Sequence, residues 1–400
     1  MTASPDAPTA VRPVAPEWQI ALAGLTVIAV SYGFARYGFG LFVPQLRDEY
    51  RLSTSTLGVI GSATYVGYLT ALTLVGVLAT RMGPRPMLMC AGFSATTGMA
   101  LVAIAPTTSV LVVGLVLAGT SSGWAWAPYS DVVDGMVRPE RQQHVMALLP
   151  VGTAFGVAVA GPLALLTHGG SWRYAWVAFS VVALLSTVYN ARTLPRGVGR
   201  RSPDGLAPVG LRWFFRRSAV PLYLTGLSYG LVGSVYWTFA MDAISTAGTI
   251  GGGREPLFWT LMGVAGIAGL STGALLARLE LTGSHRVLFV ALALAVGLLG
   301  VTPGVPGLVA ISVVVYGPSF MAVSGLLAVW SHRLFPDRPS TGFSATVFFL
   351  GLGSIAGPLA VGLVADHHGL RAAFALTAAI AAVTVLATPR AAGCTRTPGG

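Results

Sequence analysis

Apolar residues along this chain fall into long, nearly uncharged runs that short polar segments separate. No charged residue lies within 145–167 or within 219–241. A helix needs about 20 predominantly apolar residues to cross a membrane. Because the runs have this length, the pattern predicts about twelve transmembrane helices. The predicted spans are 18–43, 55–79, 87–105, 109–130, 145–167, 172–190, 219–241, 256–277, 287–302, 307–330, 343–365 and 371–389.

The composition favours a membrane protein over a soluble one. Charged residues make up 9% of the 400 residues, whereas soluble globular proteins have roughly 25%. The chain also contains 51 glycines, and small residues allow membrane helices to approach one another closely. We therefore expect an all-α polytopic membrane protein that is surrounded by a lipid bilayer.

The net charge of +11 comes entirely from arginine, because the chain has no lysine. Most of the 24 basic residues lie between the predicted spans, in alternate segments. Basic residues are enriched in the cytoplasmic loops of membrane proteins. The distribution therefore indicates a topology in the inner (plasma) membrane, with both termini in the cytoplasm. It does not indicate a nucleic-acid partner.

One long polar stretch, 191–217, divides the predicted spans into two sets of six. It contains three prolines and ends in Trp213-Phe214-Phe215 before two arginines, a pattern typical of a short helix at the membrane surface. The predicted organisation is a disordered cytoplasmic N-terminus (1–17), an N-terminal six-helix bundle (18–190), a cytoplasmic linker (191–217), a C-terminal six-helix bundle (218–389) and a cytoplasmic tail (390–400).

The two halves repeat each other at an offset of about 197 residues. Ser31–Gly33 returns as Ser228–Gly230, and Gly161–Ala164 returns as Gly357–Ala360. Ordered matches at one offset predict an internal duplication. Since both copies keep the same orientation, we expect two pseudo-symmetric bundles with a substrate site between them near the membrane midplane.

Two segments carry a resemblance to a known family. Residues 76–85, GVLATRMGPR, resemble the G-x-x-x-D-R-x-G-R-R motif of the Major Facilitator Superfamily, with Thr80 in place of the acid. Residues 32–40, YGFARYGFG, followed by Pro44, are similar to the YbfB-like bacterial branch. The resemblance covers nearly the whole chain, and it implies a monomer that transports by alternating access.

The resemblance also implies that a gating loop closes the cytoplasmic face. Gly76, Arg81, Gly83 and Arg85 belong to the first copy of the motif, and Arg278 belongs to a degenerate second copy. The alternative is that these arginines only enforce the topology.

Arg36 is the charged residue of the first predicted span. A charge exposed to lipid costs at least about 2.5–3.5 kcal/mol, so Arg36 should face the bundle interior. A guanidinium presents a rigid fork of donors to carboxylates. We therefore predict that Arg36 binds substrate, together with Tyr32, Trp124 and Tyr236 on helices that line the cavity in the resembled family. The alternative is a structural arginine that bonds carbonyl groups.

Asp131 and Asp134 lie near the end of the fourth predicted span. A carboxylate at a membrane boundary can bind and release a proton, which would couple transport to protons. The alternative is an ion pair with Arg138 or Arg141.

Glycine and proline recur together in the fifth and eleventh predicted spans. Gly161 and Pro162 stand in one, and Gly357 and Pro358 in the other. We expect them to provide close helix packing and bending where the two halves meet.

No phosphate-binding loop and no catalytic or metal-binding cluster is recognisable. We therefore predict that the chain is not an enzyme and needs no cofactor or metal. The predicted function is secondary active transport of a small solute, coupled to protons and favouring efflux over uptake. Two alternatives stay open, an importer of a small organic anion that uses Arg36 and a non-transporting membrane sensor.

Overall fold

The computed structural model describes residues 16–166, 171–195, 211–248 and 255–389, and every regular element among them is a helix. The N-terminal half contains α1 (Glu17–Ile28), η1 (Ala29–Arg36), α2 (Gly38–Leu41), α3 (Val43–Tyr50), α4 (Thr54–Met82), α5 (Pro84–Ile104), α6 (Thr108–Met136), α7 (Pro139–Leu166) and α8 (Trp172–Thr193). The C-terminal half contains α9 (Leu211–Phe214), α10 (Val220–Thr246), α11 (Glu255–Gly266), η2 (Ile267–Ser271), α12 (Thr272–Val301), α13 (Pro306–Leu334) and α14 (Pro339–Thr384).

Nine of the described segments are long and apolar enough to cross a membrane. The last of them holds two spans, because the chain turns within α14 at Gly369, whose φ of 81° suits glycine. α12 is broken in the same way at Glu280. Together with α10, and with α11 and η2 continued into α12, these segments give the predicted twelve spans.

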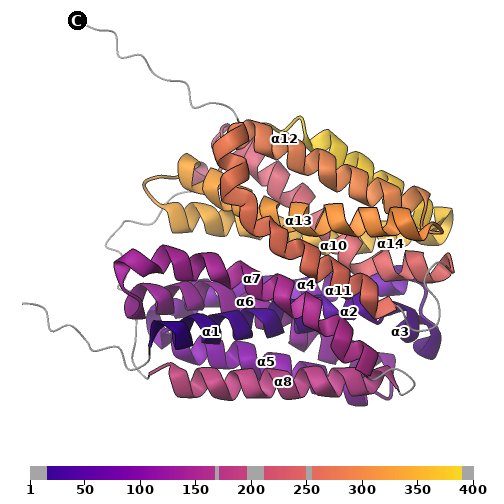
Figure 1. Ribbon diagram of the computed structural model, residues 1–400, viewed down its shortest axis with the longest axis horizontal. Coiled ribbons are helices and arrows are strands. Elements are labelled where there is room, and N and C mark those ends of the chain that lie inside the picture. The colour runs from indigo at the N-terminus through magenta and orange to yellow at the C-terminus, as the bar shows by residue number, and fades with distance from the viewer. Residues whose placement is uncertain (1–15, 167–170, 196–210, 249–254, 390–400) are drawn as a thin grey trace, which may run out of the picture.

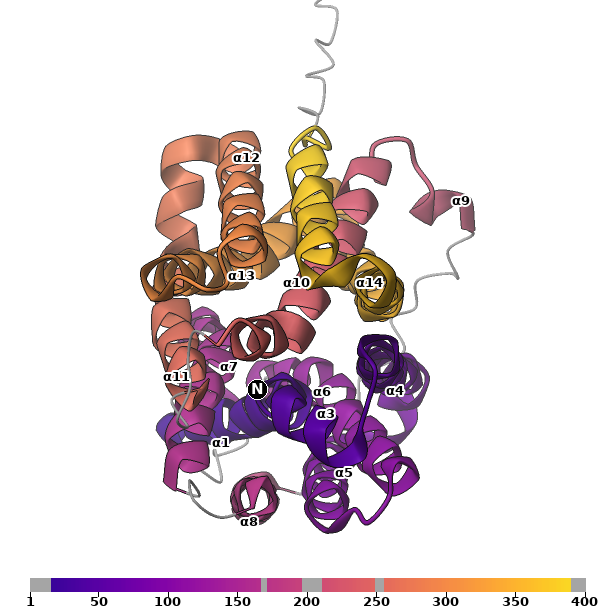
Figure 2. The same cartoon turned by 90° about the vertical axis from the view of Figure 1, so that its right-hand side faces the viewer.

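The helices form two bundles that lie one above the other. In Figure 1 the helices α1 to α8 form the lower bundle and α10 to α14 the upper one. Figure 2 shows α4 beside α14 on one side and α7 beside α11 on the other, and these two pairs make the main contacts between the halves.

Equivalent glycines bring equivalent helices together in the two bundles. A Cβ atom on Gly33 would lie 2.6 Å from the backbone of Gly156 in α7, and one on Gly230 would lie 2.0 Å from the carbonyl oxygen of Leu350 in α14. Because Gly33 and Gly230 are matched positions of the repeat, the sequence duplication corresponds to a duplicated helix contact.

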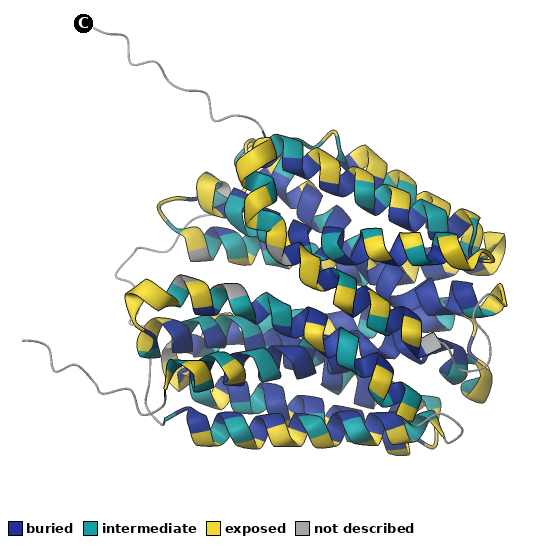
Figure 3. Cartoon of the chain, viewed as in Figure 1, coloured by how far each residue is buried: buried dark blue, intermediate teal, exposed yellow. Residues whose placement is uncertain are grey.

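The outer faces of the bundles are apolar. Figure 3 shows exposed residues along the outside of both bundles and buried residues between them. Several exposed side chains are large and hydrophobic, including Ile104 (69% exposed), Leu185 (63%) and Leu294 (60%). Such a surface suits the hydrocarbon core of a bilayer, where all-helical structure satisfies the backbone hydrogen bonds.

Two predicted spans differ in detail from the observed helices. The span predicted at 18–43 consists of several helical segments, because η1 and α2 interrupt the α-helix. The span predicted at 287–302 is longer, because its helix runs on from the break at Glu280. Within the predicted linker, Trp213 lies in α9 and packs on Phe335 with a ring separation of 4.8 Å. Residues 1–15, 196–210 and 390–400 of the predicted terminus, linker and tail lie outside the described residues.

Candidate functional site

Arg36 stands at the end of a π-helical segment in the first span. Within η1 the turns are wider than in an α-helix, and the N–H of Tyr37 donates to the carbonyl oxygen of Tyr32 at 3.1 Å, five residues back. π-helical turns occur frequently at functional sites. The wider turn changes the direction in which the following side chains leave the helix, and Arg36 is among them.

Four tyrosine rings surround the guanidinium of Arg36. Its Cζ atom lies 4.0 Å from the ring centre of Tyr68, 4.9 Å from that of Tyr65, 5.4 Å from that of Tyr32 and 5.6 Å from that of Tyr37. Aromatic faces attract cations, most strongly where water is excluded. The side chain is therefore held by ring contacts at a site where Arg36 is only 8% exposed.

The hydrogen-bonding capacity of Arg36 is not fully used. Its Nε atom is buried and has no hydrogen-bond partner. Ion pairs among the described residues include Arg47–Asp242, Arg138–Glu17, Arg141–Glu17 and Arg173–Glu49, and none of these involves Arg36. A buried cation without a counter-ion is costly, and an anionic ligand would remove that cost.

Arg36 opens onto a cavity of about 310 Å³ between the two bundles. Among the described residues that line it, Arg36 alone is charged, and many of the others are aromatic. The lining includes Tyr32, Arg36, Tyr37, Tyr65, Tyr68, Leu72, Trp126, Thr153, Tyr229, Gly233, Ser234, Trp237, Phe320, Ser324, Phe343, Ser344 and Ser354. Both halves of the chain contribute, as expected for a substrate site at a repeat interface.

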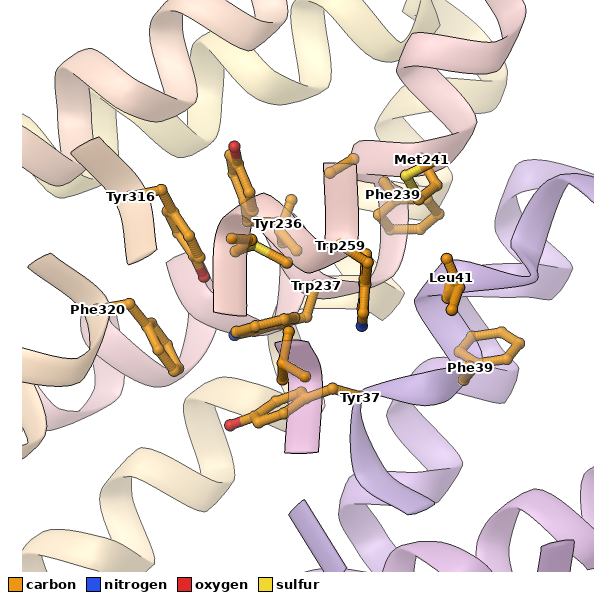
Figure 4. Packing of buried hydrophobic residues seen from close by; sticks show 14 of the residues in the cluster. Tyr37, Phe39, Leu41, Tyr236, Trp237, Phe239, Met241, Trp259, Tyr316 and Phe320 are labelled. Carbon is orange, nitrogen blue, oxygen red and sulfur yellow. The ribbon is translucent and has the colours of Figure 1, made fainter. Parts of the chain in front are cut away.

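A stack of aromatic rings closes one end of the cavity. Tyr37 from the N-terminal half stacks on Trp237 of α10, with ring centres 4.1 Å apart (Figure 4). Trp259 packs edge-on against Trp237 at 5.4 Å. A Cβ atom on Gly40 would lie 1.7 Å from the carbonyl oxygen of Trp237, so the backbones of the two halves are in direct contact there.

Polar contacts between the halves lie beyond this stack. Arg47 of α3 donates to Asp242 of α10 at 2.5 Å and to the hydroxyl oxygen of Thr54 at 3.0 Å. Asp366 of α14 accepts from the backbone N–H groups of Thr54 and Ser55 at 3.0 and 3.1 Å, so it caps the N-terminus of α4.

The other end of the cavity is accessible to solvent. Ser324 and Ser344 belong to the lining and are exposed, whereas Tyr37 and Trp237 at the closed end are buried. Ser344 stands in the second turn of α14, at the end of the bundle that carries the loop with Arg81. The cavity therefore opens toward the arginine-rich end of the molecule.

The structure brings together only two of the four predicted substrate-binding residues. Tyr32 and Arg36 line the cavity. Tyr236 does not, because it is fully buried, stacks on Tyr316 at 3.6 Å and hydrogen-bonds Ser312 at 2.9 Å.

Trp124 also lies outside the described lining of the cavity and packs against two apolar clusters of the N-terminal bundle. Sequence reasoning missed Phe320, and it gave less weight to Trp237 and Trp126, the neighbours of Tyr236 and Trp124, which line the cavity. Adjacent positions on a helix face different directions, so an error of one or two residues exchanges a packing residue for a lining residue.

The two predicted proton-coupling residues do not line the described cavity. Asp131 is half-buried and Asp134 is exposed. Of the arginines considered as their partners, Arg138 pairs with Glu17 at 2.7 Å and Arg141 with the same carboxylate at 3.6 Å. A role of either aspartate in proton movement stays a prediction.

The residues of the predicted gating loop are mostly solvent-facing. Arg81 and Arg278 are exposed, and Gly76 has open space around it. Gly83, with a φ of 74°, forms the turn between α4 and α5. Arg85 donates to the carbonyl oxygen of Ala191 at 2.8 Å, which is a contact within its own half. Gating by this loop stays a prediction.

Three of the four predicted packing residues lie at close helix contacts. A Cβ atom on Gly161 would lie 2.1 Å from the hydroxyl oxygen of Thr260 in α11, and one on Gly58 would lie 2.3 Å from the carbonyl oxygen of Pro358. Both contacts join the two halves. Gly357 instead packs on Leu231 within its own bundle, and Pro162 is exposed.

Two helical bundles around a shared cavity define the fold of a Major Facilitator Superfamily transporter. The crystal structure of a point mutant of the nucleoside transporter NupG superposes with a TM-score of 0.75 at 12% identity, covering 92% of this chain and 98% of that one. This likeness confirms the predicted fold class.

The sequence profile described as "Uncharacterised MFS-type transporter YbfB" matches residues 28–388, and the chain belongs to that family. The family is one of transporters, in agreement with the prediction that the chain is not an enzyme. Together with the apolar helices, it makes the chain a multi-pass membrane protein.

Individual relatives are similar to parts of this chain at less than 30% identity. "Transcription regulatory protein OpdE" of Pseudomonas aeruginosa is 26% identical over 305 residues, which are 74% of this chain and 75% of that protein. "Monocarboxylate transporter 11" of Homo sapiens is 28% identical over 228 residues, which are 55% of this chain and 47% of that carrier. The alignment therefore spans about half the length of the human carrier.

Proposed function

We propose that this chain transports a small organic anion and that Arg36 binds its negative charge. The observation that supports this proposal is the buried guanidinium of Arg36, which lines the cavity between the halves. Its Nε atom has no hydrogen-bond partner, and it forms no ion pair with the described residues. A carboxylate would pair with the fork of donors that arginine presents. The name of the human relative, a monocarboxylate transporter, supports the same class of solute.

Alternating access is the mechanism that the geometry favours. The cavity is closed at the Tyr37–Trp237 stack and open at the arginine-rich end. If that end faces the cytoplasm, as the distribution of arginine predicts, the structure corresponds to an inward-open state. The proposal places the chain in the inner membrane as a monomer, with both termini and the central linker in the cytoplasm.

Efflux is the proposed direction. A membrane potential that is negative inside favours the exit of an anion by about 2.3 kcal/mol per elementary charge for each 100 mV. Uptake of the same anion would need a co-transported cation. The proposed coupling ion is the proton, with Asp131 and Asp134 as candidates and the buried Asp242 as a further one.

The experiment compares charged and neutral solutes of the same shape. We expect benzoate and cyclohexanecarboxylate to raise the melting temperature of the purified protein, because a ligand stabilises the state that it binds. The corresponding amides should have no effect. Arg36→Gln should abolish the stabilisation by both acids, while Arg371→Gln, at an exposed position, should preserve it. Equal effects of acids and amides on the native chain would overturn the proposal.

A membrane sensor is the second candidate, because OpdE carries the name of a transcription regulatory protein and aligns with 74% of this chain. A measurement of solute flux distinguishes a transporter from a sensor. The purified protein is reconstituted into vesicles loaded with radiolabelled benzoate and a pH-sensitive dye. Vesicles that contain a transporter should release the label faster than protein-free vesicles loaded in the same way. Coupling to protons should add a change in the dye signal beyond that of the protein-free vesicles. Binding without release would favour the sensor.

A further inference from the structure

We propose that the solute is an aromatic monocarboxylate: one negative charge attached to one planar ring. The inference rests on the proposed anion transport and adds the chemical class of the anion. Three features of the cavity carry it, namely a single lining charge, a continuous aromatic wall beside that charge and an unpartnered indole N–H on this wall.

The charge of the cavity matches one carboxylate and no more. Arg36 is the one charged residue among the described residues of the lining. A second carboxylate on the solute would have to leave water without a cation to meet it, and an unpaired buried charge is strongly unfavourable. A neutral solute would leave Arg36 itself without a counter-ion. A single negative charge is therefore the state that the cavity selects.

The wall beside Arg36 is built from rings of both halves. Tyr37 lies 5.6 Å from the Arg36 Cζ atom and 4.1 Å from the ring centre of Trp237, so it connects the charge to the wall. Phe320 stands edge-on to Trp237 at 5.6 Å and stacks with Tyr229 at 4.8 Å. A planar ring can make stacked or edge-to-face contacts with these rings while its carboxylate meets Arg36.

The same wall presents a free hydrogen-bond donor. Trp237 is only 3% exposed, and its buried Nε1 atom has no hydrogen-bond partner. Figure 4 shows this nitrogen and the hydroxyl of Tyr37 on the side of the stack that faces Phe320. An oxygen substituent on the ring of the solute would satisfy the indole N–H. The site therefore suits a ring with a hydroxyl group in addition to the carboxylate.

The volume of the cavity is sufficient for a solute with one substituted ring. At about 310 Å³ it lies at the lower end of the range of roughly 300–1,000 Å³ that small-molecule sites occupy.

The test measures binding to the full-length protein in lipid nanodiscs by calorimetry with four probes. We expect benzoate to bind roughly 2- to 12-fold more tightly than cyclohexanecarboxylate, because aromatic contacts add to the burial of area. Phthalate, with a second carboxylate, should bind at least about tenfold more weakly than benzoate. 4-Hydroxybenzoate should bind more tightly than benzoate.

Two variants locate the effect. Trp237→Phe should remove the advantage of 4-hydroxybenzoate over benzoate, since phenylalanine has no N–H. Phe320→Leu should reduce the preference for benzoate over cyclohexanecarboxylate. The control Phe348→Leu changes a side chain of α14 that is 43% exposed and outside the described lining, and it should alter neither ratio. The comparison of probes on the native chain does not depend on any variant folding.

The outcomes separate this inference from the function on which it rests. If cyclohexanecarboxylate and benzoate bind equally and both lose binding in Arg36→Gln, the aromatic class is wrong and anion transport stands. If phthalate binds as tightly as benzoate, the single-charge requirement is wrong. If neither acid binds, or if Arg36→Gln binds them as the native chain does, both the inference and the proposed function fail.

Discussion

Arg47 and Asp242 form an ion pair that joins the two halves of the chain. The Nη2 atom of Arg47 in α3 donates to Oδ2 of Asp242 in α10 at 2.5 Å, and the carboxylate is almost completely buried. The pair lies beyond the stacked rings of Tyr37 and Trp237, on the side away from the cavity. Any conformation that opens this end of the molecule has to separate the two charges.

We therefore expect Asp242→Asn to favour opening at this end. Removing one partner of a buried pair leaves the other charge uncompensated, and even about 1 kcal/mol changes a two-state ratio roughly fivefold. The readout is labelling of the lining residue in Ser234→Cys by a membrane-impermeant maleimide added outside intact cells, in a background with Cys90→Ser and Cys394→Ser. Labelling should rise at least about fivefold. The charge swap of Arg47→Asp with Asp242→Arg should return labelling toward the native rate.

Asp366 is expected to support the same closure through the N-terminus of α4. Its carboxylate accepts the N–H groups of Thr54 and Ser55, and removing such a cap costs about 0.5–2 kcal/mol. Asp366→Ala should increase the labelling of Ser234→Cys, whereas Glu140→Ala, at an exposed position of α7, should not. Since Thr54 also accepts from Arg47, the effects of Asp366→Ala and Asp242→Asn should be non-additive. Strict additivity would contradict the shared role of Thr54.

Tyr68 is expected to stabilise Arg36 through its ring and not through its hydroxyl group. The Arg36 Cζ atom lies 4.0 Å from the ring centre, a contact that contributes about 0.5–2 kcal/mol. Tyr68→Phe should keep the melting temperature of the purified protein near its native value, while Tyr68→Leu should lower it. Equal losses in the two variants would show that the hydroxyl group is what matters.

The helix contact at Gly33 in the first span can be tested by substitution, with Gly76 as the control position. A Cβ atom on Gly33 would lie 2.6 Å from the backbone of Gly156, so Gly33→Ala should push η1 away from α7 and cost about 1–3 kcal/mol. Gly76 has nothing within 4 Å, and Gly76→Ala in a helix interior should be neutral or slightly stabilising. Thermal melting of both variants checks the difference, and equal melting temperatures would contradict it.

The spans and the position of Arg36 could be predicted because they depend on local physical costs. A run of apolar residues has few options other than a membrane or a core, and a charge within it has to face the protein interior. The matched glycines of the two halves could be predicted for a similar reason, since their spacing is written directly in the sequence.

Other features depend on contacts that no local pattern encodes. The ion pair joins Arg47 to a residue 195 positions away, and a single sequence does not reveal such pairings. The π-helical turn of η1 has no compositional signal, yet it sets the direction of Arg36. The sequence does not distinguish Trp237 from Tyr236, because both are aromatic and adjacent and only the rotation of α10 decides which of them reaches the cavity.

The position that matches Arg36 in the other half is Gly233, and its missing side chain leaves room for the ring of Phe320, which a Cβ atom would meet at 2.4 Å. The two nearly symmetric bundles thus surround an asymmetric cavity, with the positive charge of Arg36 on one wall and the apolar ring of Phe320 on the other. A solute with a charged head and an uncharged tail can bind in such a cavity in only one orientation. It would be carried with a fixed polarity, its head always with the N-terminal bundle, whichever gate is open.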